Sequence, residues 1–394
     1  MSRQSFSSAS DSAPAVVGLT VGTCGVPIWG MSTEERFRRA LQRAGVDLIH
    51  SAAQARAQGA TAVVVFRLDH VLDDALIADL AKTPDVVVIG DDGRLPVAAH
   101  VPIDRAEEAE RLLTDADPAA LAGLRRATPA EVTSAYRNSL RKRSQPYALR
   151  LTPATLPDIE WRMFMGAYKG ATDFVTKYCW PHLAVHVTRW CARRGIMPNT
   201  VTWVSLAFVL FTIWAFAHGW FLTGCLSAWI MTFLDTVDGK LARVTLTSSK
   251  LGEAFDHGID HIHPPFWYWA WMVGLREAGM ALPGEALILW IVIGGYLLGR
   301  AQEGFFLWRF GIEIHIWEPR DTWFRLVTAR RNPNVAILMV FALAGRPDLG
   351  MQAVALWTIC SLGFHFLRIY QASQAIRRGP IRSWLADPPR GSAT

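Results

Sequence analysis

The sequence predicts a two-part fold: a small soluble α/β domain at the N-terminus, then an all-α domain of six transmembrane helices with an interfacial amphipathic helix. Up to about residue 150, short Val/Ile/Leu runs alternate with charged helical stretches, whereas long apolar blocks dominate after about residue 200. The 394 residues include 17 tryptophans, which membrane interfaces concentrate. This length accommodates two domains. The expected segments are an α/β domain (1–115), a basic linker (116–157), a membrane domain (158–375) and a cytoplasmic tail (376–394).

Composition excludes some classes of function. The net charge of +6 is modest, so we expect no nucleic-acid partner. The five cysteines show neither CxxC pairing nor zinc spacing, and we expect buried or lipid-facing thiols. The first residues contain no apolar core long enough for a signal peptide. The front domain is therefore expected to remain in the reducing compartment where it is made.

The front domain is predicted from alternating strands and helices. "PAVVGLTVGT" and "ATAVVVFRLDHVL" read as strands, the second ending at Asp69, and "DVVVIGDDGRLPVAAHV" reads as two strands around a turn. "MSTEERFRRALQRAGV" reads as a helix with Ser32 and Glu35 as a capping box, and "DALIADLAK" and "DRAEEAERLL" also read as helices. This alternation predicts a small parallel sheet.

The front domain resembles a reduced sugar-phosphate nucleotidyltransferase. Pro27–Val46 is similar to the segment after that family's nucleotide loop, and "VVVFRLDHVL" to its strand ending in a metal-binding aspartate, here Asp69. The loop "VGTCGVPIWG" departs from the family, because no basic residue precedes Arg36 and a triphosphate would meet little positive charge. An inactive, scaffolding or regulatory domain and an active one both remain open.

The segments before the first span are polar or amphipathic. The basic linker is expected as a solvated helical connector or as a helix near anionic headgroups. "DIEWRMFMGAYKGATDFVTKYCW" mixes aromatic and charged residues, which predicts an amphipathic helix in the membrane interface. "PHLAVHVTRWCARRG" continues as a second helix with a basic end.

Six apolar segments approach the length of about 20 residues that a spanning helix needs. They are about 200–217, 220–240, 254–275, 284–305, 334–346 and 350–370. Basic residues cluster before the first, between the second and third, between the fourth and fifth, and after the sixth. These clusters fall on one side, which the positive-inside rule makes cytoplasmic. We therefore expect a multi-pass protein of the inner (cytoplasmic) membrane with both termini cytoplasmic.

Four aspartates lie where the second and third spans adjoin. Asp235 and Asp238 are three residues apart, and Asp256 and Asp260 four apart, so each pair shares a helix face. Carboxylates are costly in a membrane, and four at close range would not all stay ionised unaided. Oxygen ligands suit Mg²⁺ or Mn²⁺. The sequence predicts two such ions per site, clamping a phosphate during displacement.

The residues between these aspartates favour a nucleotide. Gly239 would let a substrate approach the backbone, Ala242 keeps the next turn small, Arg243 offers a fork for phosphate, and Gly252 clears space before the third aspartate. The run reads D-x-x-D-G-x-x-A-R, eight residues, then G-x-x-x-D-x-x-x-D.

This run is the signature of the CDP-alcohol phosphotransferase family, and residues 160–375 are similar to that family, including "MPNTVT" at Met197–Thr202. The resemblance implies a membrane enzyme of phospholipid synthesis that transfers a phospho-alcohol group from a CDP-alcohol, such as CDP-diacylglycerol, to a hydroxyl acceptor and releases CMP. It also implies a homodimer with its active site at the cytoplasmic face. The implied metal ligands are Asp235, Asp238, Asp256 and Asp260, with Asp260 also the general base; the implied CDP-binding residues are Gly239, Ala242, Arg243 and Gly252.

The acceptor site is less defined. His257 and His261 share a face beside the carboxylates, and with His263 they are either acceptor-pocket or metal residues or hydrogen-bonded packing histidines. Arg330 and Arg331 begin the fifth span on the active side. They either hold a phosphate of the acceptor, as basic residues do in family members that use inositol phosphate, or only follow the positive-inside rule.

Two other classes of function remain in view. A transporter or channel with an intramembrane acidic site leaves the spacing of the glycines and arginine and the front domain unexplained. A bifunctional protein would use the front domain as a cytidylyltransferase to make a CDP-polyol for an inositol phosphate type transferase. The missing basic glycine-rich loop argues against this alternative.

Overall fold

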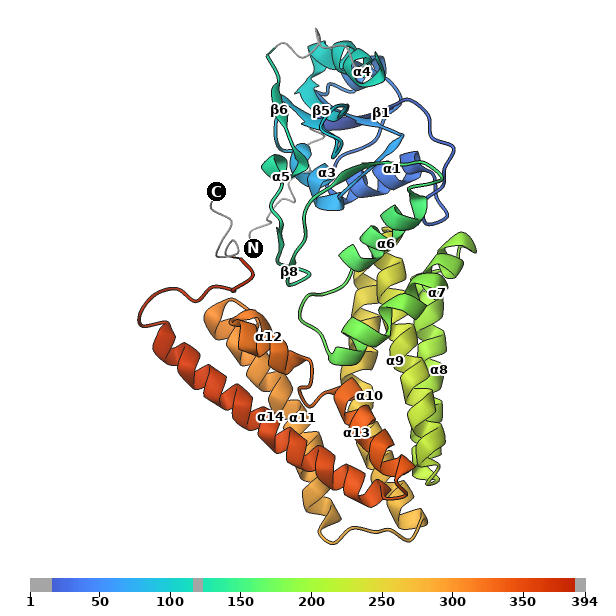
Figure 1. Cartoon of the computed structure of the whole chain (residues 1–394), viewed down its shortest axis with the longest axis vertical. Coiled ribbons are helices and arrows are strands. Elements are labelled where there is room, and N and C mark those ends of the chain that lie inside the picture. The colour runs from blue at the N-terminus through green and yellow to red at the C-terminus, as the bar shows by residue number, and fades with distance from the viewer. Residues whose placement is uncertain (1–15, 116–122, 387–394) are drawn as a thin grey trace, which may run out of the picture. The chain divides into compact units, whose positions relative to one another are not determined.

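The computed structural model describes residues 16–115 and 123–386, and within these not the side chains of Lys250, Glu253, Asp256 and His257. The chain divides into two compact units (Figure 1). Unit 1 comprises residues up to 135 together with 144–163, and unit 2 comprises 136–143 together with 164 onward. These boundaries differ from the expected ones at 115 and 157, because the chain passes between the units more than once.

Unit 1 is an α/β domain. Its strands are β1 (Val16–Val21), β2 (Ala62–Arg67), β3 (His70–Leu72), β4 (Val86–Ile89), β5 (Pro96–Pro102), β6 (Arg125–Ala127) and β9 (Ala148–Arg150). Its helices are α1 (Thr33–Arg43), α2 (Ala52–Ala57), α3 (Asp74–Leu80), the 3₁₀ turn η1 (Ile103–Arg105), α4 (Ala106–Asp115) and α5 (Pro129–Val132). As predicted, Ser32 caps α1, with its hydroxyl accepting from the backbone N–H of Glu35 at 3.1 Å.

The central sheet is mixed, so the prediction of a parallel sheet was wrong. Its order is β1-β2-β5-β4-β6. The β1–β2 and β4–β6 pairs are parallel, but β5 is antiparallel to both of its neighbours. The cause is the Asp-Asp-Gly turn, where the Asp92 carboxylate accepts from the backbone of Arg94 at 3.0 Å and Gly93 takes a positive φ of 70°. A tight turn returns the chain beside the strand it has left, in the opposite direction.

The segment expected as a helical linker is folded into both units. Its strand β6 completes the central sheet, and β9 pairs antiparallel with β3. Between them β7 (Tyr136–Arg137) and β8 (Lys142–Arg143) form a hairpin that belongs to unit 2. The connector expectation was therefore wrong over residues 125–150, while residues 116–122 lie outside the described part.

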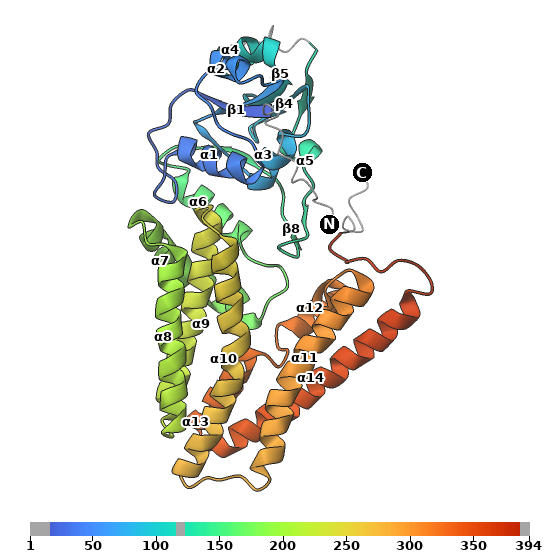
Figure 2. The ribbon, with the colours of Figure 1, turned by 180° about the vertical axis from the view of Figure 1, so that it is seen from behind.

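Unit 2 is mainly helical. After α6 (Leu156–Gly166), which begins in unit 1, come the π-helical turn η3 (Val175–Cys179), α7 (Pro181–Arg193), α8 (Pro198–Ala217), α9 (Phe221–Val244), α10 (Lys250–Glu277), α11 (Glu285–Phe310), the 3₁₀ turn η4 (Ile314–Ile316), α12 (Pro319–Arg325), α13 (Arg331–Leu343) and α14 (Pro347–Ala375). Figures 1 and 2 show α8, α9 and α10 side by side and α11 beside α14, and α13 packs on both α9 and α14.

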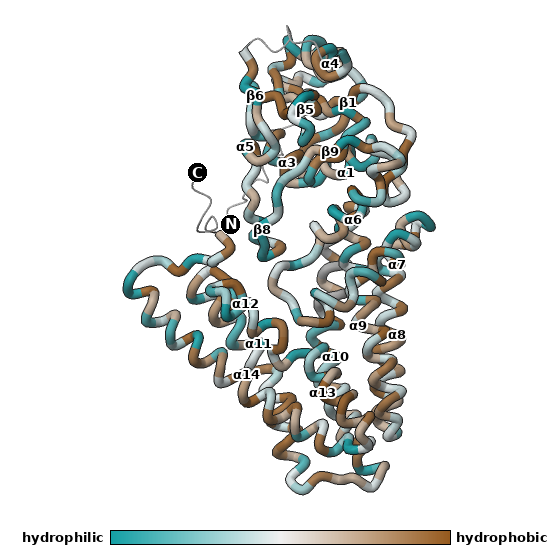
Figure 3. Tube along the Cα trace, in the orientation of Figure 1, coloured by the Kyte–Doolittle hydropathy of each residue, from teal (hydrophilic) through white to brown (hydrophobic). Residues whose placement is uncertain are grey.

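The six predicted apolar segments coincide with α8, α9, α10, α11, α13 and α14. Three of these are long and apolar enough to cross a membrane, namely α8, α11 and α14, and α13 is a shorter apolar helix. The adjoining ends of α9 and α10 carry the charged residues of the aspartate run, which lowers their hydropathy. Figure 3 shows hydrophobic residues along the long helices of unit 2 and hydrophilic ones around α12.

Aromatic side chains build much of the core between α8, α9 and α10. Trp271 is fully buried, with its ring centroid 4.8 Å from that of Phe216 and 4.5 Å from that of Phe221. All five cysteines are unbonded: Cys191 and Cys225 are buried, Cys179 and Cys360 are exposed, and Cys24 lies between. The expectation of buried or lipid-facing thiols is confirmed for Cys191 and Cys225, and it stays a prediction for the exposed Cys179 and Cys360.

Candidate active site

The aspartates come from two helices of unit 2. Asp235 and Asp238 lie one turn apart near the C-terminal end of α9, and Asp256 and Asp260 belong to the first half of α10. The Asp256 and His257 side chains lie outside the described residues, so the predictions for them stay predictions. The other three carboxylates can be placed.

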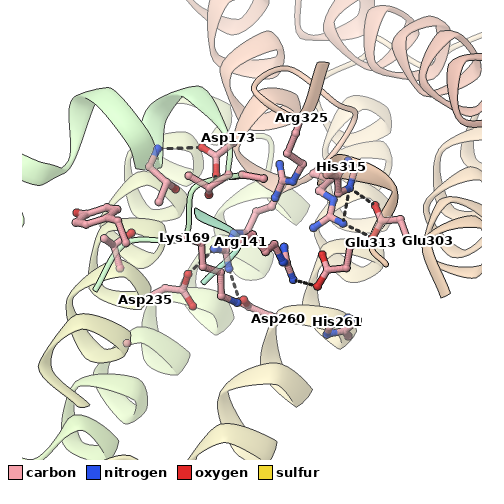
Figure 4. Close-up of a pocket in the computed structure, with 18 of the residues that line it drawn as sticks. Arg141, Lys169, Asp173, Asp235, Asp260, His261, Glu303, Glu313, His315 and Arg325 are labelled. Atoms are coloured by element: carbon pink, nitrogen blue, oxygen red, sulfur yellow. Dashed lines mark hydrogen bonds and ion pairs between the residues drawn. The ribbon is translucent and has the colours of Figure 1, made fainter. Parts of the chain in front are cut away.

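One guanidinium joins the two helices. Arg331, the first residue of α13, donates from Nη2 to Asp235 at 2.6 Å and from Nη1 to Asp260. Because the two donor nitrogens belong to one planar group, the two carboxylates share a single positive charge. Figure 4 labels Asp235 and Asp260, which lie near each other in the cavity. The helix spacing predicted that these carboxylates would converge, and they do.

The predicted entry segment "MPNTVT" supports the motif from a third helix. Thr202 on α8 donates its hydroxyl to the buried Asp238 at 2.7 Å. Asn199, one turn earlier, lies so close to Gly252 that a Cβ there would be 2.9 Å from the Asn199 amide oxygen. A side chain at Gly252 would therefore force the Asn199 amide to move, so close packing alone favours glycine at this position.

Two prolines in α10 leave two backbone carbonyl oxygens without their usual helix hydrogen bonds, and one of them belongs to the candidate general base. Pro264 and Pro265 lie inside α10 and have no N–H to donate to the carbonyls four residues earlier, those of Asp260 and His261. The Tyr296 hydroxyl, from α11, lies 3.4 Å and 3.2 Å from these two oxygens. Tyr296 thus partly replaces the lost helix hydrogen bonds and ties α11 to the turn that carries Asp260.

These groups line a cavity of about 500 Å³ inside unit 2. Asp235, Gly239 and Arg243 from the predicted motif face it, as do Asp260 and His261. Arg243 also donates to the Ala167 carbonyl at 2.8 Å. The buried Lys240 lies over the Tyr168 ring, 3.8 Å from its centroid, so the lining combines carboxylates, basic groups and an aromatic face.

A second charged cluster occupies another part of the cavity. Glu303 on α11 accepts from Arg300 at 2.6 Å and from Arg330, and it lies 3.1 Å from Nε2 of His315 on η4. His365 on α14 completes a group whose ligand-type atoms lie within 4.8 Å of one another. Burial lowers the pKa of His315 well below its usual value, against the opposing effect of Glu303, so this imidazole is neutral at pH 7.

The β7–β8 hairpin supplies a further arginine. Arg141 pairs with Glu313, which precedes η4. The hairpin lies against the chain at Gly170, where the N–H donates to the Leu140 carbonyl at 2.8 Å and where a Cβ would be 2.2 Å from the Arg141 carbonyl oxygen. Gly170 therefore permits the approach that brings Arg141 into the cavity.

A buried carboxylate lies on the same wall. Asp173 accepts from the Asn332 amide at 2.9 Å and from the backbone of Thr176 at 3.0 Å. Burial acts to raise the pKa of Asp173, but the charge of Arg325 and these hydrogen bonds outweigh it and hold the pKa below its usual value. Asp173 is therefore ionised and faces Arg325.

Comparison with known proteins gives this half of the chain its family. Residues 195–365 match the family described as CDP-alcohol phosphatidyltransferase. This region is a CDP-alcohol phosphatidyltransferase domain. It contains α8 to α13 and most of α14, including all four aspartates, whereas the β7–β8 hairpin and unit 1 lie outside it.

Named relatives carry similar sequences. Cholinephosphotransferase 1 of Danio rerio is 31% identical over 122 residues, which are 29% of this chain and 32% of that protein. Cholinephosphotransferase 1 of Gallus gallus is 33% identical over 122 residues, 29% of this chain and 36% of that protein. Ethanolaminephosphotransferase 1 of Homo sapiens is 33% identical over 91 residues, 21% of each chain. The match thus spans about a third of the cholinephosphotransferases or less.

The carboxylate oxygens in the CDP-alcohol phosphatidyltransferase domain are suitable ligands for divalent cations. Asp235 and Asp260 already hold one cationic group between them, and the buried Asp238 lies one turn from Asp235. Carboxylate oxygens from two helices are the hard ligands that Mg²⁺ and Mn²⁺ prefer. The number and identity of the ions stay a prediction.

Not every predicted residue faces the cavity. Asp235, Asp260, Gly239, Arg243, His261, Arg330 and Arg331 line it; Asp238, Ala242 and Gly252 are outside its described lining. Arg331 contacts the aspartates and Arg330 contacts Glu303, so the two residues proposed for an acceptor have different partners. His263 is a packing residue, 3% exposed, with Nδ1 2.7 Å from the Ile259 carbonyl.

Sequence reasoning missed the second cluster. Its members include Arg141, Arg300, Glu303, Glu313, His315, Arg325 and His365. One signal was present: Arg300 and Glu303 are charged residues three apart in a predicted span, where charges are rare unless functional.

The aspartate singled out in unit 1 is held by basic neighbours. Arg67 donates to both oxygens of Asp69, at 2.9 and 2.8 Å, and His70 Nδ1 lies 2.8 Å away. Burial acts to raise the pKa of Asp69, but the hydrogen bonds from His70 and Arg67 hold it well below its usual value. Both oxygens of Asp69 are engaged, whereas Asp235 and Asp260 each bind Arg331 through one oxygen. The Asp69 arrangement therefore favours a structural role.

Proposed function

We propose that the chain is an integral membrane CDP-alcohol phosphotransferase of phospholipid synthesis. The observation that carries the proposal is the convergence of Asp235 and Asp260 on Arg331, at a basic cavity within the CDP-alcohol phosphatidyltransferase domain. The names of the matched relatives, cholinephosphotransferase and ethanolaminephosphotransferase, support the same reaction class.

The reaction is a displacement at phosphorus. The acceptor hydroxyl oxygen bonds to the phosphorus that carries the donor's alcohol, and the bond from that phosphorus to the bridging oxygen breaks. CMP leaves with the bridging oxygen and its electron pair. The hydroxyl proton passes to Asp260, which is 32% exposed at the cavity and can release it to water.

The chain's residues divide these tasks. Asp235, Asp238, Asp256 and Asp260 would hold two Mg²⁺ or Mn²⁺ ions, which when bound neutralise the donor's diphosphate. Gly239 leaves the cavity wall open to the cytidine diphosphate, and Arg243 contacts its phosphate oxygens. Thr202 fixes Asp238, Ala242 keeps its turn compact, and Gly252 keeps α10 close to α8.

We propose that α8, α9, α10, α11, α13 and α14 all span the bilayer. Support for the two helices with charged ends comes from their exposed apolar faces. Leu222, Leu226 and Ile230 are spaced four apart on α9 and are each more than 40% exposed, as are Ile262, Phe266 and Trp269 on α10. Lipid is the medium that covers such a stripe at least cost.

Orientation and assembly follow from the same proposal. By the positive-inside rule, the basic clusters support a cytoplasmic location for the cavity end of the helices and for both termini, in an inner membrane. The exposed Leu183 and Trp190 of α7 suit an interfacial helix. We propose a homodimer, as the family resemblance implies.

The experiment is CMP release by the purified full-length protein in nanodiscs, with donors that include CDP-diacylglycerol and CDP-choline and a panel of hydroxyl acceptors. Asp260→Asn tests the site, and Asp348→Asn is a matched control, because Asp348, in the first turn of α14, pairs with Arg346 away from the cavity lining. CMP release that Asp260→Asn leaves unchanged, or none with any donor and acceptor pair, contradicts the proposal.

The same protein tests the bifunctional alternative. Incubation with CTP and polyol phosphates would release pyrophosphate if unit 1 were a cytidylyltransferase. The pairing of Asp69 with Arg67 and His70 leads us to expect none.

A further inference from the structure

One wall of the cavity is built by a short segment between two of the proposed spans. Residues 313–325, which we call the wall segment, comprise η4 and α12 and lie between α11 and α13. Glu313, His315 and Arg325 from this segment line the cavity. A 3₁₀ turn and a helix of 7 residues are too short to be stable alone. The position of the wall segment therefore depends on the elements that pack against it.

Helix α14 holds the wall segment at the start of α12. The buried Arg368 donates to both carboxylate oxygens of Asp321, at 2.5 and 2.9 Å. It also donates to Glu318 at 2.9 Å, and its guanidinium carbon lies 4.1 Å from the centroid of the Trp317 ring. A bidentate ion pair of this kind fixes both distance and direction. These contacts fix the first turn of α12.

A second set of contacts comes from residues 381–386, which we call the tail segment. The buried Ser383 donates its hydroxyl to the Ile316 carbonyl at 2.8 Å, and the backbone N–H of Trp384 donates to the Trp317 carbonyl at 3.2 Å. Ile316 is the last residue of η4, and Trp317 is its C-cap. Helix ends leave their last carbonyls without intrahelical partners. The tail segment thus satisfies the open end of η4.

The indole of Trp384 extends this contact towards the cavity. Its Nε1 donates to the Thr322 hydroxyl at 3.0 Å, and that hydroxyl donates to the His315 carbonyl at 2.8 Å. A chain of hydrogen bonds therefore links the tail segment, through α12, to a residue that lines the cavity. Consecutive hydrogen bonds polarise and strengthen one another.

The β7–β8 hairpin contacts both the tail segment and the wall segment. Arg143 donates from Nη1 to the carbonyls of Leu385 and Ala386, each at 3.3 Å. Arg141, two residues earlier, pairs with Glu313 at the start of the wall segment. The hairpin therefore joins the tail segment to the part of the chain that the tail segment holds.

We propose that Ser383 and Trp384 are positioning residues, through which the tail segment holds the wall segment where substrate binding requires it. The inference rests on the proposed transferase function. Neither residue belongs to the described lining of the cavity, so both act through the backbone of η4 and the Thr322 hydroxyl. The hairpin and the tail segment lie before and after residues 195–365, which match the family. This control of the cavity therefore comes from parts of the chain outside the matched region.

Hydrogen exchange locates the effect. The full-length protein in nanodiscs is compared with the double variant Ser383→Ala/Trp384→Phe, which loses two side-chain donors and keeps an aromatic ring at position 384. We expect the backbone amides of η4 and α12 to exchange roughly tenfold faster in the variant, and those of α8 to α10 to exchange as in the parent. Trp290→Phe is the control, because Trp290 is 75% exposed on α11. Unchanged exchange in η4 and α12, or faster exchange throughout unit 2, overturns the proposal.

Steady-state CMP release tests the consequence for the reaction. A variant that only folded less completely would lower kcat and leave both KM values unchanged. A displaced wall segment should instead raise the KM of the substrate that contacts it, donor or acceptor, by roughly tenfold. The Mg²⁺ concentration that gives half the maximal rate should not change, because the aspartates lie on α9 and α10. Unchanged KM values for both substrates, or a shifted Mg²⁺ requirement, overturn the positioning role.

The two proposals fail in different ways. Faster exchange confined to η4 and α12, with no CMP release by the parent from any donor and acceptor pair, supports the tail contact and overturns the transferase. CMP release by the parent that the double variant reproduces with the same KM values supports the transferase and overturns the positioning role.

Discussion

Two consecutive residues at the start of α13 face two differently charged clusters. Arg331 lies between Asp235 and Asp260, whereas Arg330 contacts Glu303 beside His315. In the first cluster the described carboxylates outnumber the arginine that binds them. In the second, the arginines outnumber the carboxylates. One cavity is therefore lined by one cluster with an excess of carboxylates and another with an excess of arginines.

The two clusters also differ in how the sequence encodes them. The aspartates occupy fixed positions in one short run of sequence, at spacings that helix geometry converts into a shared face. The second cluster draws on α11, η4, α12, α13, α14 and the β7–β8 hairpin. A site that spans so many elements can vary residue by residue, which suits the part of a cavity that selects one substrate.

Among these tests, removal of divalent cations should give the largest loss of CMP release. With chelator in the buffer we expect CMP release to fall to background, because the facing carboxylates lose the counter-charge that lets a diphosphate approach. Activity that survives in metal-free buffer would contradict the cation role of the aspartates.

Asp260→Asn should lower kcat by roughly 10²–10⁴-fold, the contribution of general-base catalysis, because an amide cannot take the acceptor's proton. Its carboxamide oxygen can still contact Arg331, so the fold should persist. Steady-state CMP release at equal amounts of folded protein measures the effect. A loss of only a fewfold removes Asp260 from the role of base.

Substitutions of the two adjacent arginines, Arg330 and Arg331, should affect CMP release differently. Arg331→Gln is expected to lower the free energy of unfolding by about 3 kcal/mol, the cost of losing one partner of a partly buried pair, and to lower CMP release because Asp235 and Asp260 lose the group that joins them. Arg330→Gln should have a smaller effect on CMP release, because Arg330 contacts Glu303 and not the aspartates. An equal loss of CMP release in the two variants would contradict separate roles for the clusters.

Tyr296→Phe should have a smaller effect. It removes the hydroxyl beside the carbonyls of Asp260 and His261, which should lower the free energy of unfolding by about 1 kcal/mol and lower kcat only a fewfold. The pH profile and the KM values should not change. Tyr370→Phe, at a residue 63% exposed on α14, is the control and should leave kcat at the parent value.

The smallest effect is expected in unit 1. Asp69→Asn should leave CMP release within about twofold of the parent, because Asp69 is paired with Arg67 and His70 in a unit that lacks the transfer motif. Thermal unfolding should still register the lost pair. A loss of CMP release with folding intact would assign unit 1 a part in the chemistry.

The sequence allowed the helices and the aspartate cluster to be predicted, because both depend on short-range spacing. Asp235 and Asp260 converge as the two helix faces require. The second cluster was beyond such reasoning, since Arg141 arrives through a hairpin and a close approach at Gly170. The prediction of a parallel sheet was wrong although the Asp-Asp-Gly turn was recognised. That turn makes β5 antiparallel to β4, and the prediction did not apply this direction to the pairing of β5 within the sheet.

Arg330 and Arg331 share a peptide bond, so the two clusters are mechanically joined at the first turn of α13. The first turn of α13 thus fixes the spacing between the aspartates and Glu303. A ligand whose binding shifted this turn would alter both clusters, and two such ligands would change each other's affinity by the same factor.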